Sequence, residues 1–108
     1  MRIDIAHVLE CPNLGLASSR VHQALEQAGR VAAVREVEVT SEEAAKALGM
    51  QGSPTILIDG CDPFQSGDPA SLSCRLYSTS AGLQGAPSVA DLVAALSDDG
   101  ETVDADDR

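Results

Sequence analysis

The sequence predicts an α/β fold, with a small four-stranded mixed sheet flanked by helices. Two observations predict it. Short runs of branched apolar residues, at 2–9 and 54–59, have the length and composition of buried strands. Between and after them, segments with apolar residues at helical spacing alternate with further strand-like segments. The 108 residues suit one domain, which we place at residues 1–97 and expect to be followed by an acidic, disordered tail at 98–108.

The first half of the chain contains two strand–helix pairs. "RIDIAHVL" (2–9) predicts a strand buried on both faces, and "LASSRVHQALEQAG" (16–29) predicts a helix ended by its glycine. "VAAVREVEV" (31–39) alternates valine and glutamate towards its end, which predicts a half-exposed strand near a sheet edge. "TSEEAAKALG" (40–49) predicts a short helix with Ser41 as its N-cap.

The second half predicts two more strands and a last helix. "PTILID" (54–59) has the composition of a buried strand, whereas 61–73 has two Asp-Pro steps and a glycine and is expected to be a loop. "CRLYST" (74–79) predicts the fourth strand, antiparallel to its neighbour. The final helix is expected to start after Ser88 and to run through Leu96.

Charge and composition narrow the range of partners. The chain carries 17 acidic residues against 7 basic ones, a formal net charge of −10. Such a chain repels a phosphate backbone, so nucleic acid is not an expected partner. No apolar run approaches the roughly 20 residues that span a bilayer, and no targeting segment is expected. We therefore predict a cytoplasmic protein with no membrane partner, and a monomer.

Cys11 is the strongest candidate for a reactive group. It follows the first predicted strand and precedes the first predicted helix, and its neighbours are Pro12 and Asn13. A thiol at a helix N-terminus meets unpaired backbone N–H groups and the positive end of the helix dipole, and both stabilise the nucleophilic thiolate. Leu14 stands where a Cys-x-x-Cys motif would have its second cysteine. A dithiol cycle within this motif is therefore impossible.

A second stretch, "GMQGSPTILIDG" (49–60), completes a resemblance to the thioredoxin superfamily. A cysteine after the first strand and a G-x-x-G-x-P-T segment leading into an apolar strand stand in the order typical of thioredoxins and their DsbA-like relatives. The resemblance covers roughly residues 2–60. It implies that Ser53–Pro54 is a cis peptide, that Ser53 faces Cys11, and that Pro12, Asn13, Ser53 and Pro54 contact the substrate.

Resolution of a mixed disulfide on Cys11 would need another thiol. Glutathione, another small thiol or a partner protein could supply it, and so could Cys61 or Cys74. We favour Cys74, because it lies at the junction of a flexible loop and a predicted strand. Cys61 follows the end of the third strand opposite Pro54, where its approach to Cys11 looks poor. A Cys61–Cys74 disulfide is the remaining pairing.

These observations predict a thiol–disulfide oxidoreductase without a cofactor, in which Cys11 is the nucleophile and Cys74 the resolving thiol. Its partner would be a protein or small-molecule thiol or disulfide. One alternative is a non-catalytic binding module that uses the groove beside Pro54. Another is a thiol protein for soft metals or organomercurials, since "SLSCRLY" (71–77) is similar to short thioredoxin-like, actinobacterial-type sequences labelled alkylmercury lyase-like. No Cys or His pair has zinc-finger spacing, so no metal site is predicted.

Overall fold

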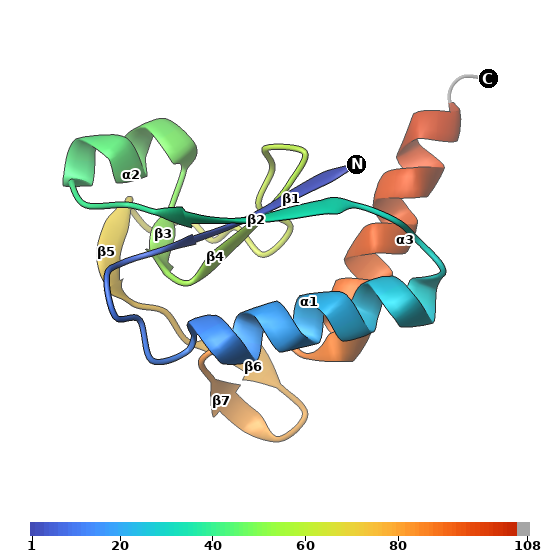
Figure 1. The fold of residues 1–108 in the computed structure, drawn as a ribbon, viewed down its shortest axis with the longest axis horizontal. Coiled ribbons are helices and arrows are strands. Elements are labelled where there is room, and N and C mark those ends of the chain that lie inside the picture. The colour runs from blue at the N-terminus through green and yellow to red at the C-terminus, as the bar shows by residue number, and fades with distance from the viewer. Residues whose placement is uncertain (106–108) are drawn as a thin grey trace.

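The computed structural model describes the backbone of residues 1–105 and the side chains of residues 1–97. The chain is a mixed α/β protein with helices on both sides of a small central sheet, as predicted (Figure 1). Its elements, in chain order, are β1 (Arg2–His7), α1 (Leu14–Ala28), β2 (Ala33–Glu38), α2 (Glu42–Leu48), β3 (Gln51–Ser53), β4 (Thr55–Ile58), β5 (Ser71–Cys74), β6 (Tyr77–Thr79), β7 (Gly82–Gln84) and α3 (Val89–Ala105).

The central sheet has the strand order β2-β1-β4. β1 runs parallel to β2 and antiparallel to β4, so that Ile5 lies opposite Glu36 on one side and Ile56 on the other. The parallel pair is connected through α1, which is the crossover expected for a strand–helix–strand unit. β2 is an edge strand, as its alternating pattern predicted.

Two apolar clusters cover the two faces of this sheet. One face of β1 and β4 packs against α1 and α3, and the other packs against α2 and β5. Successive side chains of a strand point to opposite faces, which is why neighbouring residues of β1 belong to different clusters. The buried members of the larger cluster are Ile3, Ile5, Ala17, Val21, Ala24, Leu25, Ile56, Ile58, Ala86, Leu92 and Leu96. Those of the smaller one are Ala6, Val39, Ala45 and Met50.

The predicted fourth strand does not join this sheet, and that expectation was wrong. The segment expected to form it is divided between β5, which pairs with β3 in parallel, and β6, which forms a hairpin with β7. After β4 the chain turns back for a single bridge between Ile58 and Cys61. Pro63 then lacks the N–H that a continuing ladder needs. The segment predicted as loop, 61–73, also contains the first residues of β5.

The predicted helix ends are confirmed where short-range chemistry sets them. Gly29 and Gly49 both adopt the left-handed conformation at helix C-termini. The Ser41 hydroxyl accepts a hydrogen bond from the Ala44 N–H, and that of Ser88 accepts one from the Asp91 N–H. The expected boundary between a domain ending at 97 and a tail at 98–108 falls within α3, and the side chains of that tail lie outside the described residues.

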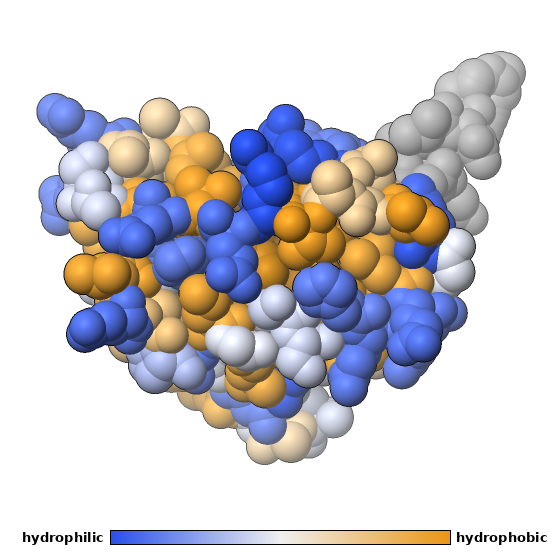
Figure 2. All heavy atoms as spheres, in the orientation of Figure 1, coloured by the Kyte–Doolittle hydropathy of each residue, from blue (hydrophilic) through white to orange (hydrophobic). Residues whose placement is uncertain are grey.

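Within the described residues, no helix combines the length and apolarity needed to cross a bilayer. Over the described part of the face shown in Figure 2, hydrophobic and hydrophilic residues are interspersed. One charged side chain is nevertheless buried in the central sheet. Asp4 is paired with Arg35 at 2.9 Å and with Arg2 at 3.2 Å. The hydrogen bond from Arg35 is the main reason that the pKa of Asp4 is lowered, against the opposing effect of burial.

Candidate functional site

Cys11 lies in a tight connection between β1 and α1. Its N–H donates to the Val8 carbonyl, and its own carbonyl accepts from the Leu14 N–H, both at 3.3 Å. Glu10 adopts a φ of 59°, which is uncommon for a residue with a side chain. Two successive turns thus place the partly buried Cys11 thiol just before the first turn of α1.

The Ser53–Pro54 peptide is cis, which confirms the expectation from the resemblance. The Ser53 hydroxyl accepts a hydrogen bond from the Val8 N–H at 3.0 Å. The same Val8 accepts the hydrogen bond of the Cys11 N–H. The turn before Pro54 is therefore tied to the segment that leads into Cys11, although the two are more than 40 residues apart in sequence.

Ser53 and Pro54 themselves are almost completely buried. The Ser53 carbonyl accepts from the Arg75 N–H at 3.0 Å, so the chain's own β5 segment lies along this turn. Gly52 permits the close approach. Its φ is 123°, and a Cβ at this position would lie 2.8 Å from the Cβ of Arg75.

Pro12 and Asn13 have different surroundings. Pro12 is exposed, whereas Asn13 is partly buried at the N-cap of α1. The Asn13 side chain makes no capping hydrogen bond; it packs against Gly85, where a Cβ would overlap it. Asn13 thus connects the start of α1 to the segment that follows β7.

Of the other two cysteines, only Cys74 lies at the Cys11 end of the sheet. Cys74 is exposed and is the register partner of Ser53. Cys61 is bridged to Ile58, which pairs with Ile3 at the beginning of β1. The four residue steps from Ile3 to His7 span roughly 13 Å of extended chain. A disulfide needs Cα atoms within about 6.8 Å of each other, so the position of Cys61 does not suit a bond to Cys11.

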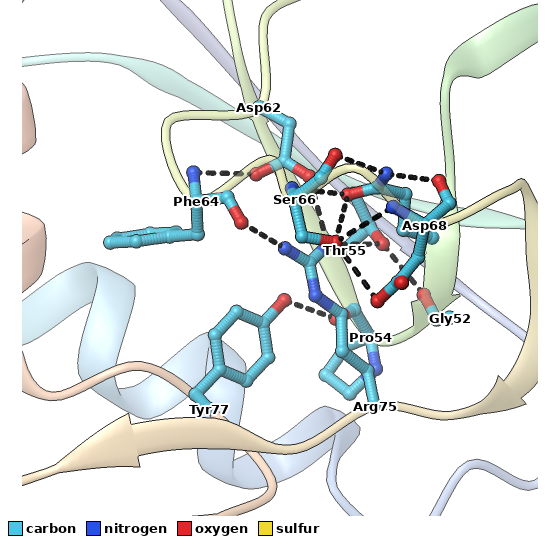
Figure 3. A network of polar contacts seen from close by, with 10 residues as sticks. Gly52, Pro54, Thr55, Asp62, Phe64, Ser66, Asp68, Arg75 and Tyr77 are labelled. Atoms are coloured by element: carbon cyan, nitrogen blue, oxygen red, sulfur yellow. Dashed lines mark hydrogen bonds and ion pairs between the residues drawn. The ribbon is translucent and has the colours of Figure 1, made fainter.

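The polar centre of this region is Arg75, which the sequence did not single out (Figure 3). Its side chain is buried and forms an ion pair with the buried carboxylate of Asp62 at 2.8 Å. The guanidinium also donates to the Thr55 hydroxyl at 3.1 Å and to the Phe64 carbonyl at 2.7 Å. One side chain thus joins β4, the 61–73 segment and the end of β5.

Tyr77 completes this network. Its hydroxyl donates to the Pro54 carbonyl at 2.6 Å, and its ring lies 4.6 Å from the Arg75 guanidinium carbon. The Phe64 and Tyr77 rings meet edge to face, with centroids 5.8 Å apart. Burial raises the pKa of Tyr77 well above its usual value, so its hydroxyl stays a donor. Phe64 packs against the larger apolar cluster and so anchors its loop to the core.

A cavity of about 490 Å³ opens beside this network. Its wall includes Cys74, Arg75 and Tyr77 together with the acidic residues Asp68 and Asp91. Cys11, Ser53 and Pro54 are not part of the wall. Ser53 therefore lies between two cysteine-containing regions. Its hydroxyl is bonded to the segment that leads into Cys11, and its register partner Cys74 belongs to the cavity wall.

The sequence could have indicated Arg75 only indirectly. It is one of seven basic residues, and it lies within 74–79, a segment of strand-like composition. No motif marks its pairing with Asp62, which precedes it by 13 residues. In the part of the chain that the structure describes, no three His, Cys, Asp or Glu side chains gather in a way that could hold a metal ion.

Comparisons with protein-family models, with curated proteins and with solved structures found no match to this chain.

Proposed function

We propose that this protein is a thioredoxin-like thiol–disulfide exchange protein, with Cys11 as the nucleophile and Cys74 as the resolving thiol. The observation that carries the proposal is the connection through Ser53. Its hydroxyl is hydrogen-bonded to the segment leading into Cys11, and its Cα is in register with Cys74. All three cysteines are free, which suits a reducing compartment such as the cytoplasm.

The exchange takes place in two steps. The Cys11 thiolate attacks one sulfur of a substrate disulfide, so a Cys11–substrate disulfide forms and the other half leaves as a thiolate that takes up a proton. The Cys74 thiolate then attacks the Cys11 sulfur and releases the second half in the same way. The substrate gains two electrons, and the protein is left with a Cys11–Cys74 disulfide.

The surroundings of Cys11 assign different roles to its neighbours. Exposed Pro12 is available for direct contact with a protein or small-molecule disulfide. Asn13, Ser53 and Pro54 are largely engaged within the protein, so we infer that they shape the site and hold Cys11 in place. The groove beside Pro54, which a binding module would use, is occupied by the β5 segment.

Competitive alkylation of the three cysteines, followed by mass spectrometry, tests the first step. We expect Cys11 to react with iodoacetamide faster than Cys61, even though Cys61 is more exposed, because Cys11 lies just before the N-terminal end of α1. Reduction of bis(2-hydroxyethyl) disulfide, with glutathione as the electron donor, tests turnover. We expect Cys11→Ser to abolish it and Cys74→Ser to slow it by at least about tenfold if resolution limits the rate.

Cys61→Ser is the matched control and should leave turnover unchanged. If Cys11→Ser and wild type have the same turnover, or if Cys11 reacts no faster than Cys61, the proposal fails. A Cys11→Ser variant that still binds a partner protein as tightly as wild type would support the binding module instead. Stoichiometric loss of the Cys11 and Cys74 thiols on titration with a mercurial, without disulfide turnover, would support the soft-metal alternative.

A further inference from the structure

We propose that the cavity beside Cys74 binds a small thiol or disulfide that carries a positive charge, and that this compound exchanges with Cys74. The inference rests on the proposed function in one respect. In the proposed function a Cys11–Cys74 disulfide forms and must be reduced again. The cavity defines the class of small thiol that reduces it. The binding preference itself can be tested without Cys11.

The cavity has the size and lining for a small organic ligand. Its volume of about 490 Å³ lies within the range usual for ligand pockets, and Cys74 belongs to its wall. Phe64, Leu76 and Tyr77 contribute apolar surface that suits the carbon chain of an aliphatic thiol. Cys74 is exposed, so a small disulfide has access to the thiol.

The charges around the cavity favour a cation. Arg75 is its basic side chain, but that charge is neutralised by the ion pair with buried Asp62. The two other charged side chains of the wall are the exposed carboxylates of Asp68 and Asp91. Among the described side chains, Asp68 accepts one hydrogen bond, from the Ser66 hydroxyl, and the Asp91 carboxylate accepts none.

Two of the neutral polar side chains of the wall are already occupied by the protein. The Gln51 side-chain amide donates to the Ser66 and Asp68 carbonyls, and its oxygen accepts from the Ser66 N–H. The Tyr77 hydroxyl donates to the Pro54 carbonyl. Among the described residues of the wall, the charged or nucleophilic groups left for a ligand are the two carboxylates and the Cys74 thiol, and Gln65 and Ser78 add neutral polar side chains. An ammonium and a sulfur in one small molecule match the carboxylates and the thiol. Figure 3 shows four residues of the wall, Ser66, Asp68, Arg75 and Tyr77, within the polar network.

Regeneration of the protein then balances without a further oxidant or reductant. The incoming thiolate attacks the Cys74 sulfur of the Cys11–Cys74 disulfide, so a Cys74–ligand disulfide forms and Cys11 leaves as a thiolate. A second molecule of the same thiol attacks the ligand sulfur and forms the free small disulfide. Cys74 leaves as a thiolate and takes up a proton. Two small thiols are oxidised, and the protein disulfide is reduced.

The experiment uses the full-length Cys11→Ser/Cys61→Ser variant, in which Cys74 is the sole cysteine. The probes are cystamine, which is cationic, and bis(2-hydroxyethyl) disulfide, which is neutral, and intact-mass spectrometry follows formation of each mixed disulfide. The Cys11→Ser/Cys74→Ser variant, with Cys61 alone, is the matched control. This control has the same net charge as the first variant. For each variant we divide the rate of reaction with cystamine by the rate with the neutral disulfide. Comparing this ratio at Cys74 and at Cys61 cancels the intrinsic reactivity of the probes and the general attraction of a cation to an acidic protein.

We expect this ratio to be about threefold to tenfold higher at Cys74 than at Cys61, because two exposed carboxylates attract the cation only modestly. Asp68→Asn with Asp91→Asn should remove most of the difference, whereas Glu36→Gln with Glu38→Gln on β2 should leave it in place. Added salt should reduce it.

Equal ratios at Cys74 and Cys61, or a difference that survives Asp68→Asn/Asp91→Asn, would overturn the assignment. The proposed function fails separately. If Cys11→Ser keeps wild-type turnover while Cys74 retains its preference for cystamine, the cavity assignment stands and the role of Cys11 does not.

Discussion

The central sheet and the segment 61–79 are stabilised in different ways. β1, β4, α1 and α3 meet through aliphatic side chains, and these contacts are many and individually replaceable. The 61–79 segment is instead held through a few polar atoms centred on Arg75, whose partners come from β4 and from the loop after it. A buried ion pair tolerates loss of one partner poorly, because the other charge is left uncompensated. Substitutions in the sheet should therefore lower its stability in small steps. Loss of one polar partner in the 61–79 segment should instead open the whole segment.

Replacing Arg75 by Met tests this difference most severely. The change leaves the buried Asp62 carboxylate without its cation and the Phe64 carbonyl without its donor. We expect a loss of about 3–5 kcal/mol in the stability of the segment. Amide hydrogen exchange should show opening of residues 62–79, while β1 and α1 keep their protection.

Two further variants sharpen this test. Replacing both partners, in Arg75→Met/Asp62→Leu, removes the orphaned charge and should recover part of the lost stability. Ile5→Val in the sheet is the control and should cost about 0.5–1.5 kcal/mol without selective opening of the segment. If Arg75→Met opens the sheet and the segment together, the two regions are one cooperative unit and the comparison is wrong.

Tyr77→Phe removes a single hydrogen bond from the same network. The Pro54 carbonyl loses a donor in a buried place, which should lower the free energy of unfolding by about 1–2 kcal/mol in urea denaturation. Because burial raises the pKa of Tyr77, phenolate absorbance in the wild type should not develop at the usual pH near 10 while the protein stays folded. Ionisation near the usual pH in the folded state would show that the ring is not buried.

The smallest effect is expected at the buried charge of the sheet itself. Asp4→Asn removes the ion pairs with Arg35 and Arg2, both of which are more than half exposed, so the loss should be below about 1 kcal/mol at pH 7. The folded-state pKa of Asp4 is lowered from 3.8. Its contribution is therefore complete above the unfolded pKa and is lost as the pH falls through the folded one.

Denaturation of wild type and Asp4→Asn between pH 7 and pH 2 measures this contribution. The stability difference should be constant down to about pH 5 and should shrink below pH 4. Glu36→Gln, on exposed β2, is the control for charge removal and should show a smaller difference at every pH. A difference that grows on acidification would contradict the lowered pKa.

Much of the fold followed from local patterns. The strand at the N-terminus, the first two helices, the start of α3 and the glycines that end α1 and α2 were predicted within a few residues, whereas α3 continues beyond the predicted Leu96 to Ala105. The fourth strand was not, because "CRLYST" has strand-like composition, and composition does not say which edge a strand will pair with. Pro63 is a local signal against continued pairing with β4, because it has no N–H to donate to a ladder.

The candidate site likewise has parts that the sequence predicted and parts that it did not. Cys11 and the cis Ser53–Pro54 peptide lie in short motifs, so the sequence indicated both. The hydrogen bond between Ser53 and Val8 and the register of Cys74 with Ser53 depend on how separate segments meet. Arg75 had no motif at all.

By itself, the sequence determined which residues face the apolar core, where the helices begin, where α1 and α2 end, and which thiol precedes a helix. These properties act between residues a few positions apart, through periodicity, capping and the backbone preferences of glycine and proline. Only the tertiary structure decided that Arg75 is buried against Asp62, that Cys74 rather than Cys61 shares an end of the sheet with Cys11, and that a cavity opens beside it. The physical reason is that hydrogen bonds, ion pairs and disulfides need atoms within a few ångströms, and the path of the whole chain sets those distances.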